Sequence, residues 1–187
     1  MFLLALAVLA VHTAVAKPFY IPSGSMLPGL LVGDRLIVSK YPYGYSYLSP
    51  SLNVLPKMDG RLFGSLPERG DIVVLKSPIA QDDWIKRVIG LPGDTVQMKD
   101  GQLWLNGVAV PKLKLADTVM KVTPNSDCAT MIDAQYRVIT PDGTAECHLP
   151  TYRETLPGGR TYTVLDLANL PQDNTEPVIV PEGHVFL

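Results

Sequence analysis

The sequence is poor in the residues that most often bind metals or activate a catalytic hydroxyl group. It has two cysteines and three histidines in 187 residues. It also lacks an H-E-x-x-H run, a Cys/His cluster and an Asp-rich loop. These absences argue against metal catalysis and against a zinc site, so we expect no cofactor.

Excess basic charge is also missing. Lysine and arginine number 16 against 18 acidic residues, which leaves a formal net charge of −2. There is no basic run and no interleaving of basic with aromatic residues, so we do not expect nucleic-acid binding. No internal repeat is visible, which argues against a solenoid.

The two cysteines, Cys128 and Cys147, permit at most one disulfide bond. Their spacing fits neither a zinc cluster nor a redox pair. A bridge would suit an oxidising compartment, and two unpaired thiols are the alternative, because geometry rather than spacing decides between them.

Long apolar runs are missing except at the N-terminus, where residues 2–16 carry no formal charge. We expect residues 1–18 to form a membrane anchor with a transmembrane helix. An apolar run of this length falls short of the roughly 20 residues a spanning helix needs, so the helix would extend to Tyr20 or begin upstream. The alternative is a cleaved secretory signal, since Ala14-Val15-Ala16 matches the small-x-small cleavage pattern, although no basic residue precedes it.

Seventeen prolines and fifteen glycines divide the rest of the chain into short apolar runs, which favour many short strands over long helices. Asp100-Gly101 and Asn106-Gly107 are typical hairpin turns and predict a β-meander. Further strand-like pieces lie at 135–140, 144–149 and 161–167.

We therefore predict a mainly β fold. Its expected parts are a catalytic β core at 19–110, a smaller inserted β lobe at 111–177, and an incomplete return to the core at 178–187. The acidic residues Asp34, Asp71 and Asp94 each follow a glycine, and we interpret them as turn residues.

Two serines, Ser23 and Ser25, lie in a proline-bounded turn that could hold a nucleophile. A serine hydroxyl reacts slowly until a base removes its proton, and histidine usually serves as that base. The histidines are poor candidates: His12 is in the apolar run, and His148 and His184 have no neighbouring nucleophile-elbow motif. A Ser-His-Asp triad is therefore disfavoured.

Lysine can replace histidine as the base where its surroundings keep the amine unprotonated. Lys86 lies between Ile85 and Val88 on a predicted strand, and alternation would place Lys86 inside and Arg87 outside. The alternative is an ordinary exposed lysine. Ser25 and Lys86 together suggest an acyl-transfer enzyme.

An acyl-transfer reaction also needs donors for the oxyanion of its transition state. The backbone N–H of Ser25 and the hydroxyl of Ser23 could serve, since Gly24 permits close approach.

In these motifs the chain strongly resembles the bacterial type I signal peptidases, the membrane-bound leader peptidase family. The matching blocks are residues 19–28, 33–34, 69–74 and 85–94, and residues 180–186 resemble the approach to a final family block. The resemblance implies that Ser25 is the nucleophile, Lys86 the general base and later general acid, and Ser23 the side-chain oxyanion donor.

The resemblance also implies a two-lobed antiparallel β domain anchored in the bacterial inner membrane, with the catalytic domain on the periplasmic face. Its partners would be the lipid bilayer and exported preproteins, which it would cleave after small residues at the first and third positions before the scissile bond. Residues implied to line or neighbour the substrate pockets are Phe19, Ile21, Pro22, Met26, Leu36, Val74, Asp83, Trp84 and Ile85.

Two departures from the family pattern stand out. The anchor region is shorter than usual, and the block Gly-Asp-Asn-Arg-Asp-Asn-Ser that should follow Leu187 is absent. We expect a chain truncated at its C-terminus, with truncation at the N-terminus as well as the alternative, and we expect this chain to be weakly active or inactive. Competing functions are a relative that processes a narrower substrate and an anchored β domain that binds exported chains without cleaving them.

Overall fold

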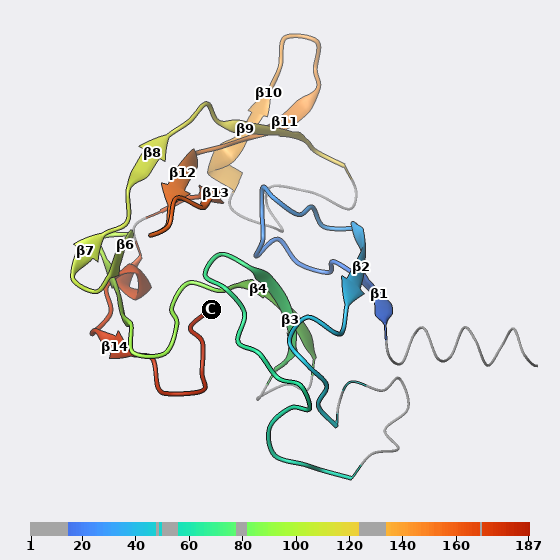
Figure 1. Ribbon diagram of the computed structural model, residues 1–187. Helices are drawn as coiled ribbons and strands as arrows, with labels where there is room; N and C mark the ends of the chain where they lie inside the picture. Colours follow the sequence, from blue (N-terminus) through green and yellow to red (C-terminus); the bar gives the residue numbers. More distant parts are fainter. Residues whose placement is uncertain (1–14, 48, 50–55, 78–81, 124–133, 169) are drawn as a thin grey trace, which may run out of the picture. The chain divides into compact units, whose positions relative to one another are not determined.

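The computed structural model describes residues 15–187 except 48, 50–55, 78–81, 124–133 and 169. This part of the chain consists of strands and loops, with two short 3-10 turns, η1 (Ala134–Tyr136) and η2 (Pro171–Asp173), and no α-helix (Figure 1). The predicted mainly β class is therefore confirmed.

The strands pair antiparallel in five small sheets within the described residues. Their bounds are β1 (Ala16–Tyr20), β2 (Arg35–Ser39), β3 (Ile72–Lys76), β4 (Asp83–Arg87), β5 (Thr95–Lys99), β6 (Gln102–Leu105), β7 (Val108–Ala109), β8 (Lys112–Lys114), β9 (Thr118–Lys121), β10 (Arg137–Ile139), β11 (Ala145–Leu149), β12 (Thr151–Thr155), β13 (Thr161–Leu165) and β14 (Val178–Ile179).

The chain divides into two compact units. Unit 1 comprises the residues up to Ile21 together with Asp34–Pro67, and unit 2 comprises Pro22–Gly33 together with Glu68–Leu187. The domain boundaries that we predicted from the sequence stay a prediction.

In unit 1, β1 pairs with β2, from Ala16 opposite Ser39 to Tyr20 opposite Arg35. Most of the predicted anchor at 1–18 lies outside the described residues. Its last part, Ala16–Pro18, is not helical but belongs to β1, so the idea that the helix extends to Tyr20 is wrong. The reason is tertiary, because the backbone here is paired with a strand some twenty residues later. Among the described residues no helix is long and apolar enough to cross a membrane.

Polar contacts connect described parts of the loop that follows β2 in unit 1. Tyr45 and Leu62 form an isolated antiparallel bridge. The Arg61 side chain donates to the carbonyl oxygens of Tyr43 and Gly44, at 2.7 and 3.0 Å. These contacts join residues 43–45 to residues 61–62.

In unit 2 the predicted meander is confirmed as β5–β6–β7. Asp100, Gly101, Asn106 and Gly107 all have positive φ angles, as tight two-residue hairpin turns require. β14 adds to the other edge of this sheet by pairing with β5.

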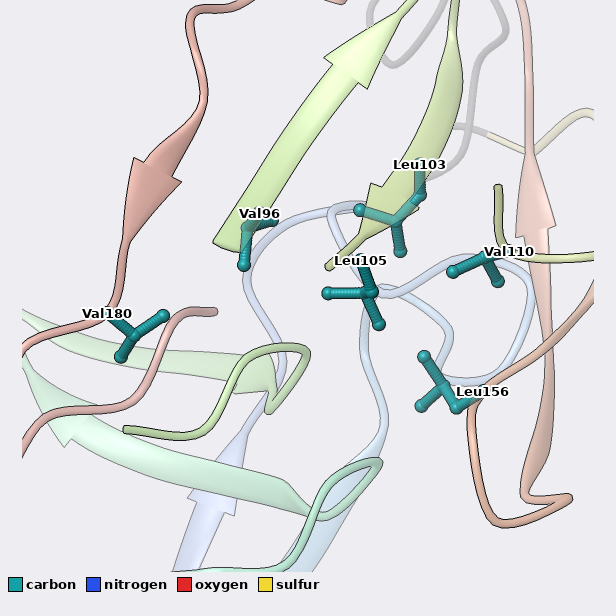
Figure 2. Packing of buried hydrophobic residues seen from close by; sticks show 6 residues of the cluster. All are labelled: Val96, Leu103, Leu105, Val110, Leu156 and Val180. Atoms are coloured by element: carbon teal, nitrogen blue, oxygen red, sulfur yellow. The ribbon is translucent and has the colours of Figure 1, made fainter. Parts of the chain in front are cut away.

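The inner face of the sheet and the segments beside it build the main hydrophobic cluster (Figure 2). Its six buried side chains come from β5, β6 and the residues that follow β7, β12 and β14; they are Val96, Leu103, Leu105, Val110, Leu156 and Val180. Ile89, Met98 and Tyr162 pack against this cluster.

A smaller buried cluster forms around Cys147 and Leu149 on β11. Cys147 is disulfide-bonded. The other cysteine of the chain, Cys128, lies outside the described residues.

The backbone of unit 2 closes tightly at Gly90. Phe186 accepts hydrogen bonds from the N–H groups of Ile89 and Gly90, at 2.8 and 3.2 Å, and its own N–H donates to the Gly90 carbonyl at 2.9 Å. A Cβ atom at position 90 would lie 2.7 Å from Val96 Cγ2 and 3.0 Å from atoms of both Phe186 and Val180.

We therefore expect Gly90→Ala to lower the free energy of unfolding by about 1–3 kcal/mol, the usual cost of overpacking a core. Urea unfolding followed by tryptophan fluorescence measures the change. Gly29→Ala is the matched control, since its added Cβ would meet Met26 at an ordinary 3.5 Å. Equal midpoints for the two variants would contradict this account.

Candidate active site

The segment that carries the two serines forms a closed turn in unit 2. The Leu27 N–H donates to the Gly24 carbonyl at 3.0 Å, so Ser25 occupies the first central position of the turn. Leu30 N–H donates to Met26 at the same distance. Leu27 is buried while Ser23 and Ser25 are exposed, so the turn has an anchored side and presents its hydroxyl groups to solvent.

Lys86 lies on a two-stranded ribbon, β3–β4, that also belongs to unit 2. In the register of this ribbon Lys86 is opposite Val73, and Trp84 is opposite Leu75. Since side chains alternate across a strand, these four residues share one face. Lys86 is half-buried, and its Nζ lies 5.9 Å from the centroid of the Trp84 ring.

The face that carries Lys86 is therefore apolar apart from its amine. Lysine is one of the side chains that can serve as a general base.

Arg87 lies on the opposite face, as alternation predicts, but the expectation that it is simply outside is wrong. Its guanidinium group lies 4.6 Å from the centroid of the Tyr162 ring and donates to the Gly70 carbonyl at 2.9 Å. Burial lowers the pKa of Arg87 from its usual value. Tyr162 in turn donates to the buried Glu154 carboxylate at 2.6 Å.

Burial raises the pKa of Tyr162 far above its usual value, and the Glu154 carboxylate raises it further. The phenol therefore stays protonated and keeps its hydrogen bond to Glu154 throughout the physiological pH range.

The predicted pocket residues fall into small groups. In unit 1, Phe19 and Leu36 are cross-strand partners, and Ile21 is 2% exposed. In unit 2, Val74 and Ile85 are cross-strand partners on the ribbon face that also holds Asp83.

The remaining predicted pocket residues lie on different faces and elements and differ in their exposure. Asp83 forms an ion pair with Lys76 at 2.7 Å. Trp84 lies on the Lys86 face rather than with Val74 and Ile85. In the serine turn Met26 is half-buried and Pro22 exposed. That these residues form one pocket stays a prediction, as does the proximity of Ser25 to Lys86.

Sequence reasoning missed an ion pair that supports the ribbon. Arg69 Nη2 lies 2.8 Å from Asp94 Oδ2, and the two side chains are only 15% and 11% exposed. Asp94 is a turn residue, as predicted, since it accepts the Leu91 N–H at 2.6 Å. It also accepts the Asn106 amide at 2.8 Å. The two residues stand in the sequence motifs Arg69-Gly70-Asp71 and Gly93-Asp94. Nothing in the spacing of these motifs predicts that Arg69 and Asp94 form an ion pair.

Asp94 has a pKa below its ordinary value. Burial alone would raise this pKa, but hydrogen bonds from Asn106, the Leu91 N–H and Arg69, with the charge of Arg69, outweigh burial. A carboxyl group whose pKa is lowered in the folded protein stabilises the fold at pH values above its ordinary pKa of 3.8. This stability is lost as the pH falls through the folded-state pKa.

We expect Asp94→Asn to lower the free energy of unfolding at pH 7 by about 2–3 kcal/mol, because Arg69 loses its counter-charge in a nearly buried site. The difference from the wild type should shrink as the pH falls below the ordinary value of 3.8, where Asp94 protonates first in the unfolded chain and, at still lower pH, in the folded protein. Urea unfolding at several pH values tests this. Asp117→Asn removes the exposed pair with Lys114 and should cost less than about 1 kcal/mol. A difference for Asp94→Asn that does not depend on pH would contradict the assignment.

Comparison with known proteins gives consistent matches. The family model described as "Signal peptidase, peptidase S26" matches residues 1–187. Signal peptidase I of Rickettsia canadensis (strain McKiel) is 33% identical over 187 residues, which cover 95% of this chain and 62% of that protein. Signal peptidase I of Rickettsia typhi (strain ATCC VR-144 / Wilmington) is 34% identical with the same coverage. The chain thus spans about 62% of the length of these relatives.

Proposed function

The chain belongs to the signal peptidase family, peptidase S26, and from this premise we propose that the protein is a serine endopeptidase that removes N-terminal signal peptides from exported preproteins. The observation that carries the proposal is Lys86 on the apolar face of the β3–β4 ribbon, in the same unit as the exposed Ser25 turn. A base and a nucleophile of these types are what acyl transfer needs.

In the proposed reaction the Ser25 hydroxyl attacks the scissile carbonyl carbon while the Lys86 amine takes its proton. The tetrahedral oxyanion accepts hydrogen bonds from the Ser25 N–H and the Ser23 hydroxyl. Lys86 then gives the proton to the departing amine, which leaves an acyl-enzyme on Ser25. A water molecule, deprotonated by Lys86, attacks this ester and releases the signal peptide, and Ser25 regains its proton.

The proposed specificity for small residues rests on side chains that would leave little room. Val74 and Ile85, on one face of the ribbon in unit 2, are bulky and half-buried. As the lining of a pocket for a substrate residue before the scissile bond, they would clash with a larger substrate side chain.

We further propose that the protein is two-lobed and lies at the periplasmic face of the bacterial inner membrane. Unit 1 supports contact with a bilayer in two ways. It exposes large apolar side chains, with Ile37 81% and Phe63 92% accessible. Its sequence also holds five basic residues against two acidic ones, although the whole chain is net negative. Exposed apolar side chains together with an excess of basic residues favour binding to a bilayer surface that carries anionic headgroups.

We expect Ser25→Ala and Lys86→Met each to lower preprotein cleavage by about 10³-fold or more, because each removes one member of a unit that works together. The assay follows cleavage of an Ala-x-Ala preprotein by the complete protein in detergent. Lys121→Ala, an exposed lysine on β9, is the matched control and should cleave like wild type. Unchanged processing by Ser25→Ala would instead favour a domain that binds exported chains without cutting them.

We also expect Ile85→Ala to admit larger residues at the pocket positions of the substrate. Removing pocket methyl groups changes discrimination by about 10–200-fold, so a preprotein with leucine in place of alanine at the third position should gain cleavage in that range. The measurement is kcat/KM for the leucine and alanine substrates. Ile72→Ala, an exposed position on the same ribbon face, should leave the ratio unchanged. If Ile85→Ala and Ile72→Ala gave the same ratio of kcat/KM values, Ile85 would not line the pocket.

A further inference from the structure

We propose that Arg69 is a positioning residue for the reaction, because it clamps the β3–β4 ribbon at the angle that presents Lys86. This inference rests on the proposed function and adds a residue to it. We use the name Arg69 clamp for the Arg69 side chain with its two acceptors, the Ile89 carbonyl and the Asp94 carboxylate.

The clamp joins two parts of unit 2 at the point where the ribbon ends. Arg69 Nη1 donates to the Ile89 carbonyl at 2.6 Å, three residues beyond Lys86. Its Nη2 pairs with Asp94 at 2.8 Å, immediately before β5. A guanidinium group suits this task because its donors form a rigid fork.

Both acceptors are themselves fixed. Ile89 packs on the main hydrophobic cluster, and its N–H donates to Phe186. Asp94 also accepts the Leu91 N–H and the Asn106 amide. Arg69 is therefore attached to a rigid support rather than to a loose surface loop.

The residues next to Arg69 continue the ribbon. Gly70 N–H donates to the Val88 carbonyl at 2.7 Å, and Val88 N–H donates to the Asp71 carbonyl at 2.8 Å. An isolated pair of strands is only marginally stable, so its direction depends on ties at its base. Because Arg69 precedes this ladder directly, its side chain ties the base of the ribbon to the sheet.

A small swing of the ribbon is enough to affect chemistry. Three residues of extended chain separate Lys86 from Ile89, about 10 Å. A rotation of about 6° at the base would then move the lysine by about 1 Å, and a misplacement of about 1 Å can cost about 10²-fold in rate.

The test compares Arg69 with Arg160, whose side chain pairs with Glu68 and Asp71 in the turn that contains Arg69. Arg69→Ala should lower kcat by about 30–100-fold with KM within about threefold of wild type. Arg160→Ala removes the more exposed pairs to Glu68 and Asp71 and should change both constants by less than about threefold. Arg69→Lys should stay well below wild type, because a single ammonium group cannot reproduce the fork.

A purely structural role would give a different result. Val110→Ala opens the main cluster, which lowers the urea midpoint but should leave kcat near wild type. If Val110→Ala loses as much kcat as Arg69→Ala, or if Arg69→Ala raises KM alone, the positioning role is overturned.

The experiments distinguish failure of the proposed function from failure of the Arg69 clamp. If the wild-type protein does not cleave the preprotein, or if Ser25→Ala does, the peptidase assignment fails whatever Arg69 does. The clamp is then judged by amide hydrogen exchange of residues 83–90. Faster exchange in Arg69→Ala than in Arg160→Ala supports the clamp, and equal exchange overturns it.

Discussion

Unit 2 depends on the close passage of the backbone between β4 and β5. Val88 is fully buried there, and Gly90 lies against Val96, Val180 and Phe186 with no room for a side chain. The β3–β4 ribbon and the four-stranded sheet lead away from this segment in opposite directions along the chain. The backbone geometry of the segment therefore sets the direction of both. The backbone of Phe186 takes part directly, so the strand that carries Lys86 is supported by residues almost one hundred positions later.

The β3–β4 ribbon accommodates two consecutive cationic residues on one half-buried strand. A charge removed from water needs partners, and a half-buried strand offers few. Arg87 finds them on its own face in the Gly70 carbonyl and the Tyr162 ring. Lys86 faces the other way, toward Val73 and Trp84. Alternation along β4 thus places the Arg87 guanidinium group, which is held by these contacts, and the Lys86 amine on opposite faces of the ribbon.

The strands that could be predicted from the sequence are those that are defined by neighbouring residues, such as the turns at their ends. The meander β5–β6–β7 follows from its two Asx-Gly turns, whose positive φ angles any neighbouring fold would need. β12 escaped prediction because its buried positions are polar. Thr151 and Glu154 lie inside because Thr118 and Tyr162 supply their hydrogen bonds, and these come from other strands. The burial of β12 is therefore a property of the fold and not of its own residues.

The same distinction separates the parts of the site. Ser25 and Lys86 stand in local motifs, whereas the Arg69–Asp94 pair joins residues that only the tertiary structure brings together. Asp94 shows why a correct local interpretation can be incomplete. A carboxylate has about four acceptor positions, and the turn uses one of them, for the Leu91 N–H. The others can bind groups elsewhere in the fold, here Asn106 and Arg69. An aspartate assigned only to a turn therefore still needs its remaining partners identified.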